Sequence, residues 1–150
     1  MKKFVFLICV LVGSLWVGSA MAQSEESSQE APFDWTPVID AITWHESRGH
    51  ADAVNGIYVG ILQIAPIMVR ECNNILKQRG KSERFTLDDR KNPEKSKEMF
   101  YLIMSKYNPE NDIDKACRLW KGGIRYSIKH TQGFVNWVRR YMEQHKDDKK

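Results

Sequence analysis

The sequence predicts a mainly helical domain of the α+β class, with about five helices and one small β-hairpin segment. Two observations predict this fold class. Apolar residues recur at three- and four-residue intervals in five stretches, and proline, asparagine or glycine stands at their ends. Only the stretch 55–66 breaks the pattern, because β-branched and aromatic residues follow an Asn-Gly turn signal there. We expect a hairpin at this stretch; a loop is the alternative.

Residues 1–22 have the layout of a secretory signal peptide, with Lys2 and Lys3 before an apolar core at 4–17 and a small-residue site ending at Ala22. The alternative is an uncleaved N-terminal anchor, but the apolar run is short for a membrane span. We therefore expect cleavage near Ala22, export to the periplasm or beyond, and no stable membrane span afterwards.

The remainder divides into a polar linker at 23–34, a domain at 35–145 and a charged tail at 146–150. Removing Lys2 and Lys3 lowers the count of Lys and Arg from 23 to 21, against 19 Asp and Glu, so the mature chain is only mildly basic. It has no concentrated Lys/Arg stripe, and we expect no nucleic-acid partner.

Local signals place the first three helices. The first begins at Thr36-Pro37, where a capping residue precedes proline at the first helical position, and stops near Gly49. The second follows Pro66 and ends at Gly80, and the third begins at Asn92-Pro93. Asp88 and Asp89 read as the polar start of a helix. The inward residues of the second and third helices are Met68, Val69, Cys72, Ile75, Leu76, Met99, Phe100, Ile103 and Tyr107.

The fourth helix begins around Asp112 and runs to the Gly122-Gly123 pair, and the last begins near Thr131. Their inward residues are Ile113, Ala116, Cys117, Trp120, Phe134, Val135, Val138, Tyr141 and Met142. Because Cys9 leaves with the signal peptide, Cys72 and Cys117 remain as a pair in an exported chain. The alternatives are a disulfide and two buried thiols.

Glu46 stands where the apolar stripe of the first helix should continue. At about 100° per residue it falls within one arc with Ile39 and Ile42, whereas Asp40 points the opposite way. It is thus directed to the edge of the core in the last turn of its helix. Apolar surroundings and the partial negative charge of a helix C-terminus both favour the protonated acid, the form that a general acid needs. The alternative is that the side chain turns into solvent.

The residues around Glu46 resemble the signature of soluble lytic transglycosylases, a lysozyme-like family that cleaves bacterial peptidoglycan in the cell wall. The resemblance rests on Glu46-Ser47, on Ala53 and on the segment "GILQIAP" at 60–66. Two later blocks follow in the same order: "RLWKGG" at 118–123 is similar to the family's A-Y-N-x-G block, and "HTQGFVNWVRRY" at 130–141 to its final block. The resemblance covers about residues 35 to 142.

The resemblance implies a lysozyme-like fold, in which the helices surround a substrate groove beside the small β segment. It also implies a lyase reaction on the β-1,4 bond between N-acetylmuramic acid and N-acetylglucosamine. A single glutamate, here Glu46, protonates the glycosidic oxygen and then removes the proton of the muramoyl 6-hydroxyl, which leaves a 1,6-anhydro end. Such glycosidases commonly use two carboxylates, but substrate-assisted enzymes are an exception because the substrate's 2-acetamido group stabilises the charge at C1. The implied partner is the peptidoglycan glycan strand.

The resemblance also implies roles for substrate-binding residues, each with a plainer alternative. Ser47 would orient Glu46 or the acetamido group, or else hydrogen-bond locally at the helix end. Gln63 would hydrogen-bond sugar near the cleavage point, or else be a polar residue on a strand face. Tyr58 and Trp120 are candidates for stacking on sugar rings or for ordinary packing. Trp44 is a weaker candidate of the same kind.

Two positions depart from the family pattern. Lys121 replaces the asparagine of the A-Y-N-x-G block, and an ammonium close to Glu46 would favour the carboxylate and oppose the general acid. Alternatively Lys121 extends outward and meets carboxylates of the peptide stems. Phe134 replaces a tyrosine and lacks its hydroxyl, for which Tyr126 is a candidate substitute.

Three other functions are weighed against this one. A hydrolytic muramidase on the same fold would need a second carboxylate, for which Asp52 is the nearest candidate. A non-catalytic glycan-binding module is favoured by Lys121 and Phe134. Metal chemistry has little support, because the four histidines, which are His45, His50, His130 and His145, lack the spacing of metal ligands. We expect no cofactor.

Overall fold

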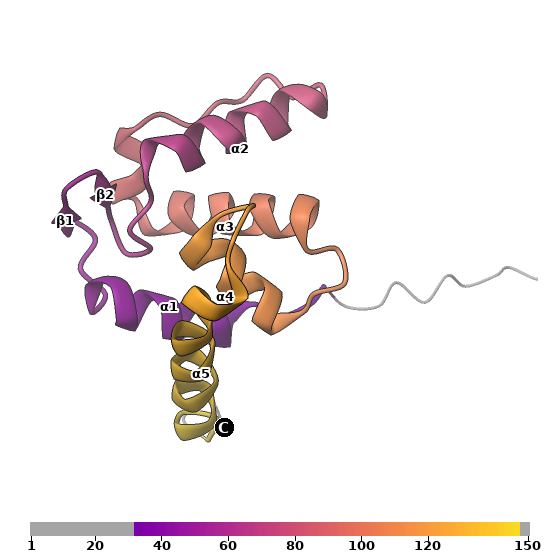
Figure 1. Cartoon of the computed structure of the whole chain (residues 1–150). Coiled ribbons are helices and arrows are strands. Elements are labelled where there is room, and N and C mark those ends of the chain that lie inside the picture. Colours follow the sequence, from indigo (N-terminus) through magenta and orange to yellow (C-terminus); the bar gives the residue numbers. More distant parts are fainter. Residues whose placement is uncertain (1–31, 148–150) are drawn as a thin grey trace, which may run out of the picture. The chain divides into compact units, whose positions relative to one another are not determined.

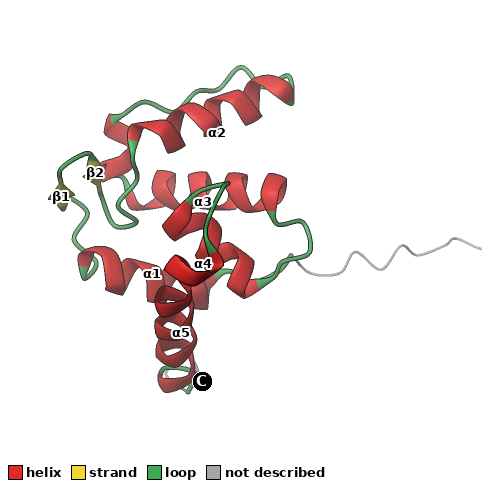
Figure 2. Ribbon diagram, viewed as in Figure 1, coloured by secondary structure: helices red, strands yellow, loops and turns green. Residues whose placement is uncertain are grey.

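The computed structural model describes residues 32–147, which contain five α-helices, one short 3-10 helix and a two-stranded antiparallel sheet (Figures 1 and 2). The domain is therefore mainly helical with one small β element, as predicted. The expected signal peptide, residues 23–31 of the linker and residues 148–150 of the tail lie outside the described residues. Within 32–147, no helix is both long and apolar enough to cross a membrane.

The first helix, α1, spans Thr36–Ser47. Thr36 is its first helical residue and not its cap, because Trp35 occupies the cap position without a capping side chain. The backbone N–H of Thr36 is satisfied instead by Oδ1 of Asp34, at 2.9 Å. The helix ends where Arg48 takes a left-handed conformation, with φ of 55°. The end near Gly49 and the proline in the first turn are confirmed.

After the hairpin, three helical elements begin at or next to the proline, asparagine and aspartate residues that predicted them. Helix α2 spans Pro66–Gln78, the 3-10 helix η1 spans Asp88–Lys91, and α3 spans Pro93–Tyr107. The Asn92 side chain caps α3 by accepting from the backbone N–H groups of Glu94 and Lys95. The polar start predicted at Asp88 is confirmed, since η1 begins there.

The last two helices are α4, Ile113–Gly122, and α5, Ile128–Gln144. Asp112 caps α4, as expected, by accepting from the N–H of Lys115 at 2.7 Å. The predicted start of α5 at Thr131 is wrong by one turn. Ser127 caps the helix, and the Thr131 hydroxyl donates to the Ser127 carbonyl at 2.7 Å from inside the first turn. Lys129 and His130 hid this start, and Ile128, the apolar residue of the first turn, is exposed and does not join the buried stripe.

The hairpin predicted after Asn55 is confirmed in a minimal form. Strand β1 (Val54–Asn55) pairs with β2 (Tyr58–Val59), with Val54 opposite Val59 and Asn55 opposite Tyr58. Gly56 supplies the left-handed conformation that the turn requires, with φ of 61°. After β2 the chain doubles back, and Ile64 forms a bridge with Val59.

The apolar faces of the helices meet in one core around Phe100, whose ring lies 5.6 Å from that of Trp35 and 5.0 Å from that of Trp120. Helix α2 packs along α3, while α5 packs against α4 and α1 (Figure 1). Cys72 and Cys117 are free thiols in this core, and burial raises the pKa of each to about 12. Of the two alternatives for this pair, the structure has the buried thiols.

Candidate active site

Glu46 lies in the last turn of α1 and is mostly buried, since 17% of its side chain is exposed. One cation meets it: Nζ of Lys121, from the last turn of α4, donates to Oε1 of Glu46 at 3.1 Å. The same ammonium lies 5.3 Å from the centre of the Phe134 ring, on α5. Three helices thus bring an acid, a cation and a buried aromatic ring to one point.

The contact between Lys121 and Glu46 is the first of the two alternatives that the sequence leaves open for this lysine. The ammonium and the carboxyl group form an ion pair at hydrogen-bond distance. The Lys121 side chain is 42% exposed, so solvent screens the attraction and the lysine has room to move away. In this structure Glu46 is one member of an ion pair whose other member is partly exposed.

His45 also lies beside Glu46, and its contact was not predicted. Its Nδ1 is 3.3 Å from Oε1 of Glu46, but the atoms are not aligned as a hydrogen bond and Nδ1 is buried without a partner. The imidazole lies edge-on to Phe134 and Trp137, with ring centres 4.9 and 4.7 Å apart. The sequence signal was its place in the last helical turn, where a cation is favoured.

Ser47 connects the end of α1 to the loop after the hairpin. Its hydroxyl lies 3.1 Å from the carbonyl oxygen of Thr43 and 2.9 Å from that of Ile61, and it accepts from the N–H of Gly49 at 3.2 Å. No described hydrogen bond joins this hydroxyl to the carboxyl group of Glu46. The local role at the helix end is therefore present, and it also fixes the distance from Glu46 to the loop.

The other motif residues are hydrogen-bonded to one another in that loop. The N–H of Gly60 donates to the carbonyl of Ala53 at 2.8 Å, and Nε2 of Gln63 donates to the carbonyls of Ala53 at 3.2 Å and Gly60 at 3.0 Å. Gly60 has φ of 83°, and a Cβ there would stand 1.7 Å from the carbonyl oxygen of Arg90. The spacing of alanine, glycine and glutamine in the motif thus has a structural reason.

Two side chains from distant elements hold the loop from outside. Nη1 of Arg90, in η1, donates to the carbonyls of Ile57 and Ile64 at 3.1 and 3.2 Å. Nε1 of Trp120, in α4, donates to the carbonyl of Leu62 at 3.1 Å. The half-buried indole of Trp120 is thus used in packing. Arg90 was not predicted, because nothing near it in sequence indicates a partner some 30 residues away.

The remaining candidates do not contact Glu46 in any described hydrogen bond or ion pair. Tyr58 is 47% exposed on the hairpin, and Trp44 is 46% exposed with the Arg48 guanidinium 5.0 Å from its ring centre. Tyr126 is half-buried beside Gly122 and packs against the core. Asp52 is exposed in the loop after α1.

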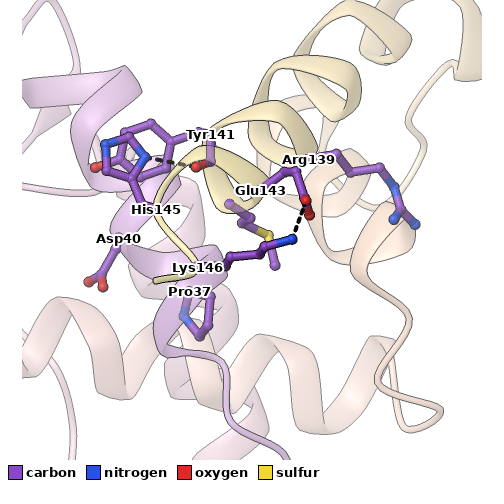
Figure 3. A pocket seen from close by; sticks show the side chains of 8 residues that line it. Pro37, Asp40, Arg139, Tyr141, Glu143, His145 and Lys146 are labelled. Atoms are coloured by element: carbon purple, nitrogen blue, oxygen red, sulfur yellow. Dashed lines mark hydrogen bonds and ion pairs between the residues drawn. The ribbon is translucent and has the colours of Figure 1, made fainter. Parts of the chain in front are cut away.

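Several hollows on the described surface are lined by residues other than Glu46. One, of about 540 Å³, lies between the start of α1 and the end of α5, where Tyr141 and His145 stack and Lys146 pairs with Glu143 (Figure 3). The others lie beside the 81–89 segment and between the start of α2 and the end of α4.

No family model, no curated protein and no solved structure matches this chain. The site therefore has to be interpreted from its own chemistry. Within residues 32–147, no group of three or more His, Cys, Asp or Glu side chains is arranged to hold a metal ion. What the described residues do provide is a single mostly buried carboxyl group at a helix C-terminus, beside a rigidly hydrogen-bonded loop.

Proposed function

We propose that this protein is an exported lytic transglycosylase of the lysozyme-like class, acting on peptidoglycan with Glu46 as its acid and base. One observation carries the proposal: Glu46 is mostly buried at the end of α1, and the other motif residues, Ser47, Ala53, Gly60 and Gln63, form one hydrogen-bonded unit next to it. The resemblance of this motif to soluble lytic transglycosylases supplies the reaction.

The reaction needs one carboxyl group. Protonated Glu46 donates its proton to the glycosidic oxygen while the bond from C1 of N-acetylmuramic acid to that oxygen breaks. The 2-acetamido group of the same sugar stabilises the positive charge at C1. The Glu46 carboxylate then takes the proton of the 6-hydroxyl as O6 bonds to C1, which closes the anhydro ring and returns Glu46 to its protonated form. No second acid and no water is consumed.

Lys121 sets the resting state of this site. While its ammonium donates to Oε1 at 3.1 Å, that oxygen is occupied and is not open to a glycosidic oxygen. Catalysis therefore requires Lys121 to leave, and its exposure allows this. Carboxylates of the peptide stems, which flank the scissile bond in peptidoglycan, are suited to attract the released ammonium.

The experiment is a digest of purified sacculi with the wild-type protein and with Glu46→Gln, followed by mass spectrometry of the soluble products. We expect anhydromuramoyl ends from the wild type and none from the variant. Reducing ends would instead establish the hydrolytic muramidase, and equal product from both proteins would exclude Glu46 as the acid.

The Lys121–Glu46 pair also favours a second candidate, a glycan-binding module without catalysis. A permanently paired carboxylate would accept hydrogen bonds from sugar hydroxyls and would never donate a proton. Sacculus binding without release of soluble fragments, unchanged by Glu46→Gln, would establish this function.

A further inference from the structure

We infer that His45 is a positioning residue for Glu46: its Nδ1 is the second hydrogen-bond partner, to which the carboxyl group turns when Lys121 leaves. The inference rests on the proposed function only for the identity of the reacting acid. Neither the motif nor the reaction requires a histidine at this position. What points to it is one unsatisfied atom.

Among residues 32–147, Nδ1 of His45 is the one buried side-chain nitrogen or oxygen atom without a hydrogen-bond partner. Buried polar atoms are almost always bonded, so an unpaired atom at a candidate site calls for an explanation. The closest described acceptor is Oε1 of Glu46 at 3.3 Å, which already accepts from Lys121. Nδ1 and the Lys121 ammonium therefore face the same oxygen, and only Lys121 is aligned with it.

The ring is the fixed member of this pair. Edge-on contacts with Phe134 and Trp137 hold the imidazole in place, whereas one described hydrogen bond holds the Glu46 carboxyl group, through the exposed Lys121. A change in the carboxyl torsions alone would align Oε1 with Nδ1 without moving the backbone. Catalytic hydrogen bonds are often poorly aligned before substrate binds and shorten afterwards.

This exchange suits an acid that must take and give a proton. Around the pair, α5 contributes the uncharged rings of Phe134 and Trp137, with Tyr141 stacked beyond Trp137, and α4 contributes Lys121 as the charged neighbour. A ring N–H can orient the carboxyl group through one directed hydrogen bond, in place of the ion pair with Lys121. About a third of the His45 side chain is exposed, so its other edge is open to solvent.

A first test does not depend on activity. Nitrogen-15 NMR of the imidazoles should show the proton of His45 moving towards Nδ1 in Lys121→Met, and moving away from it when Glu46→Leu is added. The signals of His145, whose Nδ1 lies 2.8 Å from a carbonyl oxygen of its own helix, should stay constant. If the His45 tautomer is the same in all three proteins, the inference is wrong.

A second test separates positioning from packing. His45→Phe keeps a ring between Phe134 and Trp137 but has no nitrogen, whereas His45→Asn can place an amide N–H near the former Nδ1. We expect His45→Phe to lower kcat by about tenfold or more with little change in KM, and His45→Asn to recover most of it. Equal rates for folded wild type and His45→Phe would overturn the inference. Equal rates for wild type and Glu46→Gln would instead overturn the proposed function, and the NMR result would then decide the role of His45.

Discussion

Glu46 and Glu71 are two carboxylates with similar surroundings and different connections. Their side chains are 17% and 21% exposed, and each Oε1 accepts from a lysine of another helix, Lys121 at 3.1 Å and Lys106 at 2.9 Å. Glu71, in α2, also accepts from the Tyr107 hydroxyl at 2.6 Å and from the Asn74 amide at 3.4 Å. Glu46 has no further aligned donor among the described residues.

The number of hydrogen-bond partners distinguishes Glu71, which belongs to a structural ion pair, from Glu46, the candidate catalytic acid. The Tyr107 hydrogen bond, assisted by Lys106 and Asn74, holds the pKa of Glu71 below its usual range despite the opposing effect of burial. Glu71 is therefore committed to the ionised form. Glu46 has one described hydrogen bond, through an exposed side chain, and one unaligned neighbour. A carboxyl group that exchanges protons needs hydrogen-bond partners that can be replaced. Of these two glutamates, Glu46 has such partners.

The strongest contrast is expected in activity. Glu46→Gln should lower the release of anhydromuropeptides from sacculi by roughly 10²–10⁴-fold, since general acid–base catalysis contributes about that much. Glu71→Gln, the matched change at the other paired glutamate, should retain wild-type rates at temperatures where it is folded. If Glu71→Gln abolishes release and Glu46→Gln does not, the two carboxylates have been assigned the wrong roles.

For the free energy of unfolding, we expect the larger effect at Glu71 and the smaller one at Glu46. Glu71→Ala removes the acceptor of the Tyr107 hydroxyl, and one hydrogen bond to a charged group contributes about 1.5–3 kcal/mol. The partly exposed Lys106 pair adds little, so we expect a loss of about 2 kcal/mol. Glu46→Ala loses one exposed lysine contact and should change the free energy of unfolding by less than about 1 kcal/mol. Urea unfolding followed by circular dichroism measures both, and a larger loss at Glu46 would contradict the comparison.

These two carboxylates also show what sequence could and could not predict. The position of Glu46 on the apolar arc of α1 follows from residues within one helix, and so do the caps at Asn92 and Asp112. The network of Glu71 was not predicted, because its partners come from α3, some 35 residues later. The hydrogen bonds from Arg90, in η1, to the loop carbonyls of Ile57 and Ile64 were not predicted for the same reason. Periodicity encodes which face is buried, but not which distant donor meets a given acceptor.

Lys121 was identified because it departs from the family motif. We expect its replacement to change the lytic rate less than replacement of Glu46 does. Lys121→Asn restores the residue type of the family pattern and removes the cation that occupies Oε1 of Glu46. An exposed ion pair contributes about 0.2–1 kcal/mol, which corresponds to a rise in lytic rate of up to roughly fivefold. Lys106→Asn, at the other pair, should leave the rate unchanged. A lower rate in Lys121→Asn would mean that the lysine serves the reaction.

The smallest expected effect is the pH dependence of the Glu71 network. Because its pKa is lower in the folded protein than in the unfolded chain, where glutamate titrates near 4.3, the network stabilises the fold above about pH 4. That contribution disappears as the pH falls through the folded value, when the carboxylate gains a proton in both states. The stability difference between wild type and Glu71→Gln, which solvent screening holds to about 1 kcal/mol, should therefore be full at neutral pH and shrink below about pH 4. Chemical unfolding of both proteins between neutral and acidic pH measures this. A difference that grows on acidification would show that Glu71 is bound as the neutral acid, and the contrast with Glu46 would then fail.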